Sequence, residues 1–318
     1  MLVTLGPPGR SCCAGRTLDR VTTVETPPTR SKARAFLALM KLRIVELLLV
    51  TTVPTMVIAE QGIPSLWLIF ATLFGGTLAA GGAHAFNMYI DRDIDKVMER
   101  TKHRPLVTGE ITPREALIFA WAIEIFAFGW LWATVNLLSA CLAVSATLFY
   151  VFVYSLWLKR NSKSNIVIGG AAGAVPVLVG WSAVTNTLDW PPVVLFAIIF
   201  YWTPPHFWAL AIRYKDDYQA AEVPMLPVVE TLKTTATRIV IYSAILWALT
   251  LVFAPVADMG LVYIVAAIVV GGVFFGLSLQ VYRKPEPKIA MALFGWSITY
   301  VTLLFGAMAV DVVVRHGL

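Results

Sequence analysis

The sequence reads LWLIFATLFGGTLAAGGAHAF from Leu66 to Phe86 and continues NMYIDRDID from Asn87 to Asp95. The first part carries no formal charge and is long enough to cross the hydrocarbon core of a bilayer as a helix. The second part places an amide and three carboxylates where that helix leaves the hydrocarbon. The stretch therefore predicts a membrane-spanning helix that delivers acidic side chains to the membrane surface.

Three of these polar residues repeat at every fourth position. At about 100° per residue, Asn87, Asp91 and Asp95 fall within roughly 80° of one another, on one ridge of a helix. Asp93 points to the opposite side. A ridge of hard oxygen ligands can hold Mg²⁺ while leaving coordination positions open for phosphate oxygens. The alternative is a solvated helix end that carries incidental acids, and a second acidic cluster, described below, favours the ligand interpretation.

The composition is that of a polytopic membrane protein. Hydrophobic residues make up 58% and charged residues 14% of the chain, and the mean hydropathy is +0.75. A soluble core of this length would need far more polar surface, which excludes a soluble protein. Apolar runs of about 20 residues predict an all-α fold with nine transmembrane helices, at residues 36–59, 66–90, 115–134, 137–158, 165–185, 192–213, 238–257, 261–282 and 289–314.

The basic residues predict the orientation. In the nine-helix arrangement, every Lys and Arg except Arg315 lies before the first span, at its start, or in connections on the same side of the membrane. Positive residues collect on the cytoplasmic side, so the N-terminus is predicted to be cytoplasmic and the C-terminus outside. The net charge of +6 is then a consequence of topology and does not suggest nucleic-acid binding.

The first 34 residues differ from the rest of the chain. They are rich in Pro, Gly, Ser, Thr and Arg and contain no apolar signal-peptide core. We expect residues 1–34 to form a disordered cytoplasmic tail and residues 35–318 to form one membrane domain. Cys12, Cys13 and Cys141 have no metal-like spacing, so neither a disulfide nor a cysteine metal site is predicted.

A second group of charged residues follows the predicted sixth span and contains Arg213, Lys215, Asp216 and Asp217. The predicted topology puts it on the same side as the connection that begins at Asp91. Such a mixture of charges suits a diphosphate, because Mg²⁺ bridges carboxylate and phosphate oxygens while Arg and Lys bond the remaining oxygens. A departing diphosphate also needs its developing charge stabilised. The alternative is ordinary salt bridging at the membrane surface.

Longer motifs carry a resemblance to a known family. They are NMYIDRDID at 87–95, MERT at 98–101 with RPL at 104–106, NIVIGG at 165–170, TPPHFWAL at 203–210 with the following Asp217-Tyr218, and VPMLP at 223–227. With them the chain resembles the UbiA-type intramembrane prenyltransferases over roughly 36–314, and within that superfamily the protoheme IX farnesyltransferase family. The resemblance implies Mg²⁺-dependent transfer of the farnesyl group of farnesyl diphosphate to a vinyl group of heme B. The product would be heme O, made in the plasma membrane, with a downstream heme A synthase as a further partner.

The resemblance also implies roles for individual residues. The metal ligands, which are also the catalytic residues, would be Asn87, Asp91, Asp95 and Asp217. The residues that bind substrate would include Arg100, Arg104 and Lys159 as direct phosphate ligands, and also Arg213, Lys215 and Asp216. The chain departs from the fuller acidic motif of other superfamily members, because Ala221 stands four residues after Asp217. Whether Glu222 replaces the missing acid is left open.

Two histidines are candidates for contact with a heme. His206 lies about mid-membrane in the predicted sixth span. Asp217 follows three helical turns or about 16 Å later on nearly the same face, which Arg213 shares. A porphyrin could bind this imidazole inside the bilayer while its acidic edge meets Arg or Lys near the surface. The alternative is a packed histidine at a helix interface. His84 lies three residues before Asn87 and could support the metal, contact the heme or accept a proton, and a structural contact between spans is an equal alternative.

Two other functions compete. Prenylation of an aromatic acid or quinone precursor would share the metal site and differ in the acceptor pocket, where His206 would be dispensable. An ion-coupled transporter would use the acids as a cation path. Transporters tend to show internal repeats and ionisable groups near the midplane, whereas here the acids cluster at one surface and no repeat is seen. Transport is therefore disfavoured.

Overall fold

The computed structural model describes residues 31–317, apart from the side chains of residues 43–49. Within this part of the chain there are helices and connections and no strand. The helices are α1 (Lys32–Leu39), α2 (Leu42–Glu60), α3 (Leu66–Ile90), α4 (Arg92–Val97), α5 (Pro105–Thr108), α6 (Pro113–Thr134), α7 (Leu137–Leu148), the π-helix η1 (Phe149–Leu158), α8 (Lys159–Asn161), α9 (Asn165–Thr185), α10 (Trp190–Arg213), α11 (Lys215–Ala220), α12 (Leu226–Val229), α13 (Leu232–Val256), α14 (Leu261–Arg283) and α15 (Pro287–His316).

Eight helical segments in the described residues are long and apolar enough to span a membrane, which confirms a multi-pass all-α membrane protein. The predicted first span, 36–59, is not one helix. It is divided between α1 and α2 at Lys41, whose backbone is left-handed with φ of 49°. After this break, α2 runs from Leu42 to Glu60. The total of nine spans and the orientation of the termini stay predictions.

Residues 1–30 of the predicted tail lie outside the described residues. Residues 32–34, which were assigned to the tail, belong to α1. The boundary between α6 and α7 lies where the sequence indicates. α6 ends at Thr134, and Asn136 caps α7 by accepting a hydrogen bond from the N–H of Ser139 at 2.8 Å.

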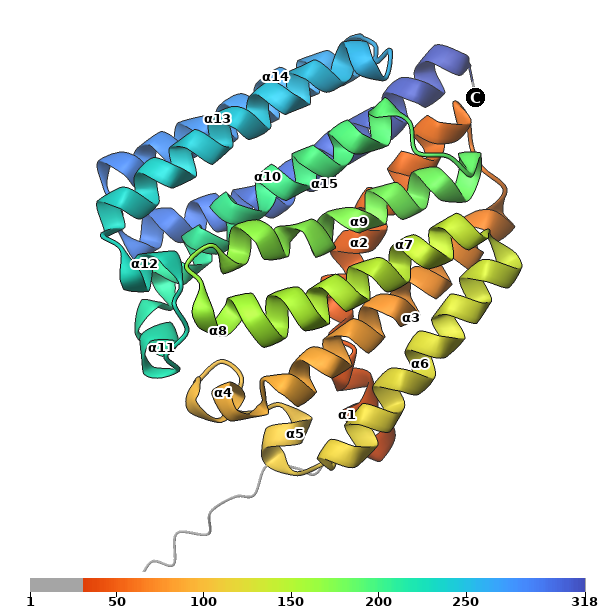
Figure 1. The fold of residues 1–318 in the computed structure, drawn as a ribbon. Coiled ribbons are helices and arrows are strands. Elements are labelled where there is room, and N and C mark those ends of the chain that lie inside the picture. The colour runs from red at the N-terminus through yellow and green to blue at the C-terminus, as the bar shows by residue number, and fades with distance from the viewer. Residues whose placement is uncertain (1–30, 318) are drawn as a thin grey trace, which may run out of the picture.

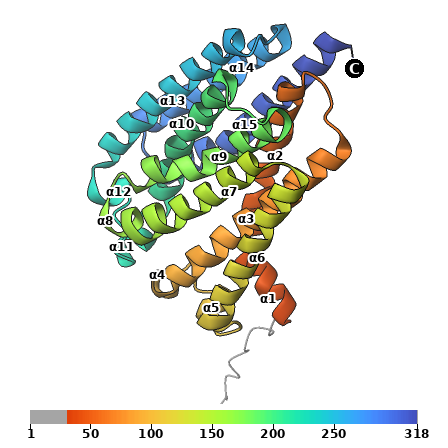
Figure 2. The ribbon, with the colours of Figure 1, turned by 45° about the vertical axis from the view of Figure 1, so that its right-hand side comes forward.

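The long helices form a closed ring. Each packs against its neighbour along the chain from α2 through α3, α6, α7, α9, α10, α13 and α14 to α15, and α15 returns to contact α2. Figures 1 and 2 show the short elements α4, α5, α11 and α12 at one end of the ring and the C-terminus at the other. The two charged connections predicted from the sequence therefore lie at the same end of the molecule.

At the opposite end, a carboxylate of one helix caps another. Asp311 of α15 is buried and accepts hydrogen bonds from the backbone N–H groups of Gly260 at 2.6 Å and Tyr263 at 3.2 Å. These are orphan donors at the start of α14, which has no capping side chain of its own. We expect Asp311→Ala to lower the free energy of unfolding by about 1–3 kcal/mol, because it leaves these donors unsatisfied.

The measurement is the unfolding midpoint in detergent, with prenyl transfer assayed in parallel. Asp258→Ala is the matched control. Asp258 lies at the same end of the molecule, but its side chain is 93% exposed in the ion pair with Arg315, and exposed ion pairs contribute little to stability. Equal stability of the two variants would contradict the capping role, and transfer should be retained by both.

Candidate active site

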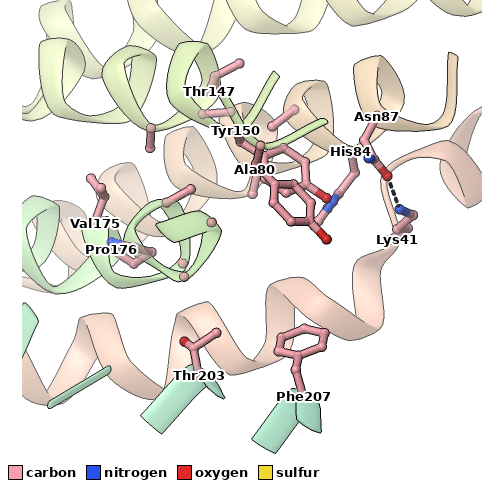
Figure 3. Close-up of a pocket in the computed structure, with 18 of the residues that line it drawn as sticks. Lys41, Ala80, His84, Asn87, Thr147, Tyr150, Val175, Pro176, Thr203 and Phe207 are labelled. Atoms are coloured by element: carbon pink, nitrogen blue, oxygen red, sulfur yellow. Dashed lines mark hydrogen bonds between the residues drawn. The ribbon is translucent and has the colours of Figure 1, made fainter. Parts of the chain in front are cut away.

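A large cavity lies inside the ring of helices and has a volume of about 1650 Å³. A pocket for one drug-sized ligand measures about 300–1,000 Å³, so this cavity has room for more than one organic molecule. Figure 3 shows its interior, with His84 and Tyr150 on one side and Thr203 and Phe207 of α10 on the other. Most of the lining is apolar, and the charged groups gather at the end near α4 and α5.

The three ridge residues come together at this end. Although α3 ends and α4 begins around Asp91, the N–H of Asp91 bonds to the carbonyl of Asn87 at 2.9 Å. The N–H of Asp95 likewise bonds to the carbonyl of Asp91 at 2.8 Å. The four-residue register therefore continues through the turn, and the side chains of all three residues are buried. Asn87 and Asp95 line the cavity.

Asp93 lies on the other side of α4, as the spacing predicts. Its side chain is 63% exposed and pairs with Arg160 through both oxygens at 2.7 Å. The hydrogen bonds from Arg160 hold the pKa of Asp93 well below its usual range. This carboxylate therefore has a surface partner and takes no part in the ridge.

Each ridge carboxylate has a basic partner. Lys159 donates to Oδ2 of Asp91, and Arg104 donates to Oδ2 of Asp95 at 2.5 Å. Both basic residues also line the cavity. The sequence analysis assigned them to phosphate, and the structure places them beside the carboxylates as well, so they can serve either partner.

A third cation was not assigned to the site from the sequence. Lys41, at the break between α1 and α2, donates from Nζ to Oδ1 of Asn87 at 2.9 Å (Figure 3). A signal for it existed, because a lysine inside a predicted apolar span usually marks a functional site. The sequence analysis used Lys41 only as an orientation marker at the start of that span.

The ridge fits a divalent cation. Oδ1 of Asp91 is buried without a hydrogen-bond partner, and an oxygen left in this way needs an explanation such as an ion. The remaining oxygens of the ridge belong to carboxylate and amide groups, which are the ligands that Mg²⁺ takes. Mg²⁺ commonly binds only one or two protein carboxylates and completes its coordination shell with substrate phosphate and water. No group of three or more His, Cys, Asp or Glu residues suited to a metal occurs in the described residues.

The second charged cluster lies differently from the prediction. α10 ends at Arg213 and α11 begins at Lys215, with a turn at Tyr214, so the single continuous helix assumed from His206 to Asp217 is wrong. The turn breaks the register, because helical spacing holds only while the backbone stays helical. Arg213, the last residue of α10, borders a separate small pocket with Glu286 and Lys288.

The other members of this cluster are also outside the cavity lining. Asp217 and Lys215 are half-buried, and Asp216 is exposed. The neighbouring Tyr218 does line the cavity, together with Arg100. Burial raises the pKa of Tyr218, and a hydrogen bond from Arg100 opposes the rise. The metal role of Asp217 and the substrate-binding roles of Arg213, Lys215 and Asp216 stay predictions.

His206 lines the deeper, apolar part of the cavity. Its imidazole stacks on Trp202 at 4.4 Å and on Phe294 at 4.5 Å, measured between ring centroids. Its Nδ1 contacts Oγ of Ser297 at 2.6 Å. The ring is thus held by three neighbours within the interface between α10 and α15.

His84 and two tyrosines that line the cavity are in contact with one another. His84 makes an edge-to-face contact with Tyr150, and Tyr150 stacks on Tyr154. Both tyrosines belong to η1, and a π-helical stretch often occurs at a functional site. Gly169 of α9 packs directly on Tyr154, where any Cβ would clash with the ring. This contact requires glycine at position 169.

Comparison with known proteins agrees with this architecture. A curated protoheme IX farnesyltransferase from Parafrankia sp. (strain EAN1pec) is 57% identical over 282 residues, which cover 87% of this chain and 90% of the relative. Another, from Frankia alni, is 56% identical over 290 residues, covering 89% and 99%. A third, from Clavibacter sepedonicus, is 52% identical over 290 residues, covering 90% and 95%.

Solved structures share the fold at low identity. A structure from work on digeranylgeranylglyceryl phosphate synthase has a TM-score of 0.74 at 16% identity and covers 89% of this chain and 99% of that one. A UbiA homolog from Archaeoglobus fulgidus bound to GPP and Mg²⁺ has a TM-score of 0.59 at 18% identity, covering 86% and 99%. The model of the UbiA prenyltransferase family matches residues 48–309. The resemblance predicted from the motifs is confirmed, and the chain belongs to the UbiA prenyltransferase family.

Proposed function

We propose that the chain transfers the farnesyl group of farnesyl diphosphate to a vinyl group of heme B, producing heme O and diphosphate. The observation that carries the proposal is a single cavity with two chemically different ends. One end gathers buried carboxylates and cations, and the other presents a stacked imidazole among aromatic rings. The names of the curated relatives, which are protoheme IX farnesyltransferases, support the same acceptor.

The polar end suits the diphosphate. Asn87, Asp91 and Asp95 are the residues that would hold Mg²⁺, and the ion would neutralise diphosphate charge as the leaving group departs. Lys41 and Arg104, which now pair with ridge oxygens, can donate to phosphate oxygens instead. Lys159 and Arg100, which also line the cavity, supply further donors.

The reaction that fits this geometry begins with cleavage of the allylic C–O bond. The electron pair leaves with the diphosphate, where Lys41, Arg104 and Lys159 stabilise the charge. The vinyl π electrons of the porphyrin then form the new C–C bond to the farnesyl carbon. Water adds to the resulting cation and releases a proton, which leaves a hydroxyl group on the product. The apolar lining protects the allylic cation from premature capture by water.

A single assay tests the proposal. Purified protein in detergent is incubated with farnesyl diphosphate and Mg²⁺, with either heme B or an aromatic acid as acceptor, and the product is identified by mass. We expect a farnesylated heme that carries one added water, and no product without Mg²⁺. Product from the aromatic acid alone would move the assignment to the rival prenyltransferase reaction, which uses the same metal site.

We further propose that the protein lies in the plasma membrane with the ridge end facing the cytoplasm, where heme O would pass to a downstream heme A synthase. The distribution of Lys and Arg supports this orientation.

Cysteine labelling tests the orientation. Single cysteines replace the exposed residues His103, Ala220 and Thr187 in a chain whose own cysteines have been replaced. We expect a membrane-impermeant thiol reagent to label positions 103 and 220 from the cytoplasmic side only, and position 187 from outside only. Labelling of 103 and 187 from the same side would contradict the orientation.

A further inference from the structure

We infer that Ser297 is a positioning residue that fixes the tautomer and orientation of His206, so that Nε2 is the atom offered to the heme iron. This inference rests on the proposed function, because it takes heme B as the acceptor. It concerns a residue of α15 that belongs to none of the motifs found in the sequence and does not line the cavity.

The hydrogen bonds around Ser297 decide where the imidazole proton lies. Oγ of Ser297 lies 2.6 Å from the carbonyl oxygen of Phe294 and 2.6 Å from Nδ1 of His206. A carbonyl oxygen only accepts, and a hydroxyl has one proton. Since Ser297 donates that proton to Phe294, Nδ1 of His206 must be the donor in the second contact. The imidazole is then the Nδ1–H tautomer, and Nε2 carries the lone pair.

Nε2 is left free in a ring that faces the cavity. Among the described residues it has no hydrogen-bond partner. His206 as a whole is only 8% exposed, but its Nε2 is not fully buried. Histidines that bind a metal usually donate the other ring N–H to an acceptor of the protein, which fixes the ring and raises its basicity as a ligand. The two consecutive hydrogen bonds, from Nδ1–H of His206 to Oγ of Ser297 and from that hydroxyl to the carbonyl of Phe294, have this form.

Ser297 also orients one of the two aromatic rings that hold the imidazole. Its carbonyl oxygen accepts a hydrogen bond from Nε1 of Trp202 at 2.8 Å. Trp202 and Phe294 both stack on His206, with interplanar angles of 21° and 25°. The imidazole can neither tilt nor turn without disturbing both rings. One serine therefore fixes the protonation state of the ring through its hydroxyl and contributes to its orientation through its backbone.

The test is a heme titration followed by absorbance, with farnesyl diphosphate binding measured in parallel. We expect Ser297→Ala to weaken heme binding about 10- to 100-fold, the usual range for removal of such a supporting hydrogen bond, and to change the Soret spectrum. Farnesyl diphosphate affinity should stay unchanged, because the polar end of the cavity is untouched. Ser297→Thr restores a hydroxyl and should recover the wild-type spectrum.

Ser278→Ala is the matched control for loss of a buried serine. Ser278 is as fully buried as Ser297, donates to the carbonyl of Phe274 at 2.9 Å and contacts Ser243, away from the cavity lining. It should lose some stability and keep the heme spectrum of the wild type. A spectral change in Ser278→Ala equal to that in Ser297→Ala would assign the effect to packing and overturn the inference.

A double-variant comparison separates this inference from the proposed function. In His206→Gly, added imidazole should restore the heme spectrum, and Ser297→Ala should then add no further change, because the free imidazole no longer depends on the serine. If His206→Gly alters heme binding while Ser297→Ala matches wild type, the positioning role is wrong and the proposed function stands. If the wild-type protein binds no heme and prenylates only an aromatic acid, the proposed function and this inference both fail.

Discussion

Asp91→Asn and Asp95→Asn are each expected to reduce farnesyl transfer by about 100- to 1,000-fold, the range for loss of a group that stabilises developing charge. Both carboxylates are buried on the ridge. Each substitution removes one negative charge from the set of oxygens that would hold Mg²⁺, and keeps the side-chain volume. The measurement is the rate of heme product formation at saturating Mg²⁺, with membrane insertion checked by the yield of folded protein in detergent.

Asp93→Asn is the control for this prediction. The substitution is the same and lies in the same short helix, but the side chain of Asp93 is 63% exposed and contacts Arg160 at the surface. We expect its activity to stay within a few-fold of wild type, since surface ion pairs contribute little. Equal losses for Asp93→Asn and Asp91→Asn would refute the argument that the four-residue spacing selects the functional acids.

The second large effect is expected for Lys159→Met. It leaves the carboxylate of Asp91 buried without its hydrogen-bonded cation, because Arg160 lies 4.0 Å from the other oxygen and is too distant to replace it. Breaking a buried pair from one side costs about 3–5 kcal/mol of unfolding free energy. Transfer should also be lost, since a donor to the diphosphate is removed. Thermal unfolding and product formation measure the two effects.

The double variant Lys159→Met with Asp91→Asn separates stability from catalysis. Neutralising both partners removes the uncompensated charge, so we expect most of the stability to return while transfer stays lost. Lys159→Arg keeps the positive charge and should stay close to wild type in stability. Recovery of transfer in the double variant would show that Lys159 and Asp91 form a purely structural pair.

Local patterns in the sequence were enough for the membrane class and for the position of the ridge. A run without formal charge predicts a span wherever it is long enough, because the bilayer imposes that length. The spacing of Asn87, Asp91 and Asp95 predicts a common face. The prediction holds because backbone hydrogen bonds of 2.9 and 2.8 Å continue the helical register through the turn at Asp91. The motifs also identified the family, since they extend over most of the membrane domain.

The same reasoning failed where the backbone leaves the helix. Periodicity assumes a continuous helix, and nothing in the local pattern marked the turn at Tyr214 or the left-handed residue Lys41. The turn takes Asp217 out of the helical register of His206, and Asp217 does not line the cavity. The break at Lys41 has the opposite result and brings a cation to Asn87. In both places a side chain lies where the turn puts it and not where the helical spacing predicts.

By itself, the sequence determined that this is an all-α membrane protein of the UbiA family with an acidic ridge at the end of one span, because these properties depend on composition, local spacing and motifs. Only the tertiary structure decided which groups meet across helices. Ser297 and His206 are 91 positions apart and Lys159 and Asp91 are 68 apart, and no spacing rule relates residues so distant in the chain. Such contacts depend on which faces of the helices meet when the ring closes from α15 to α2.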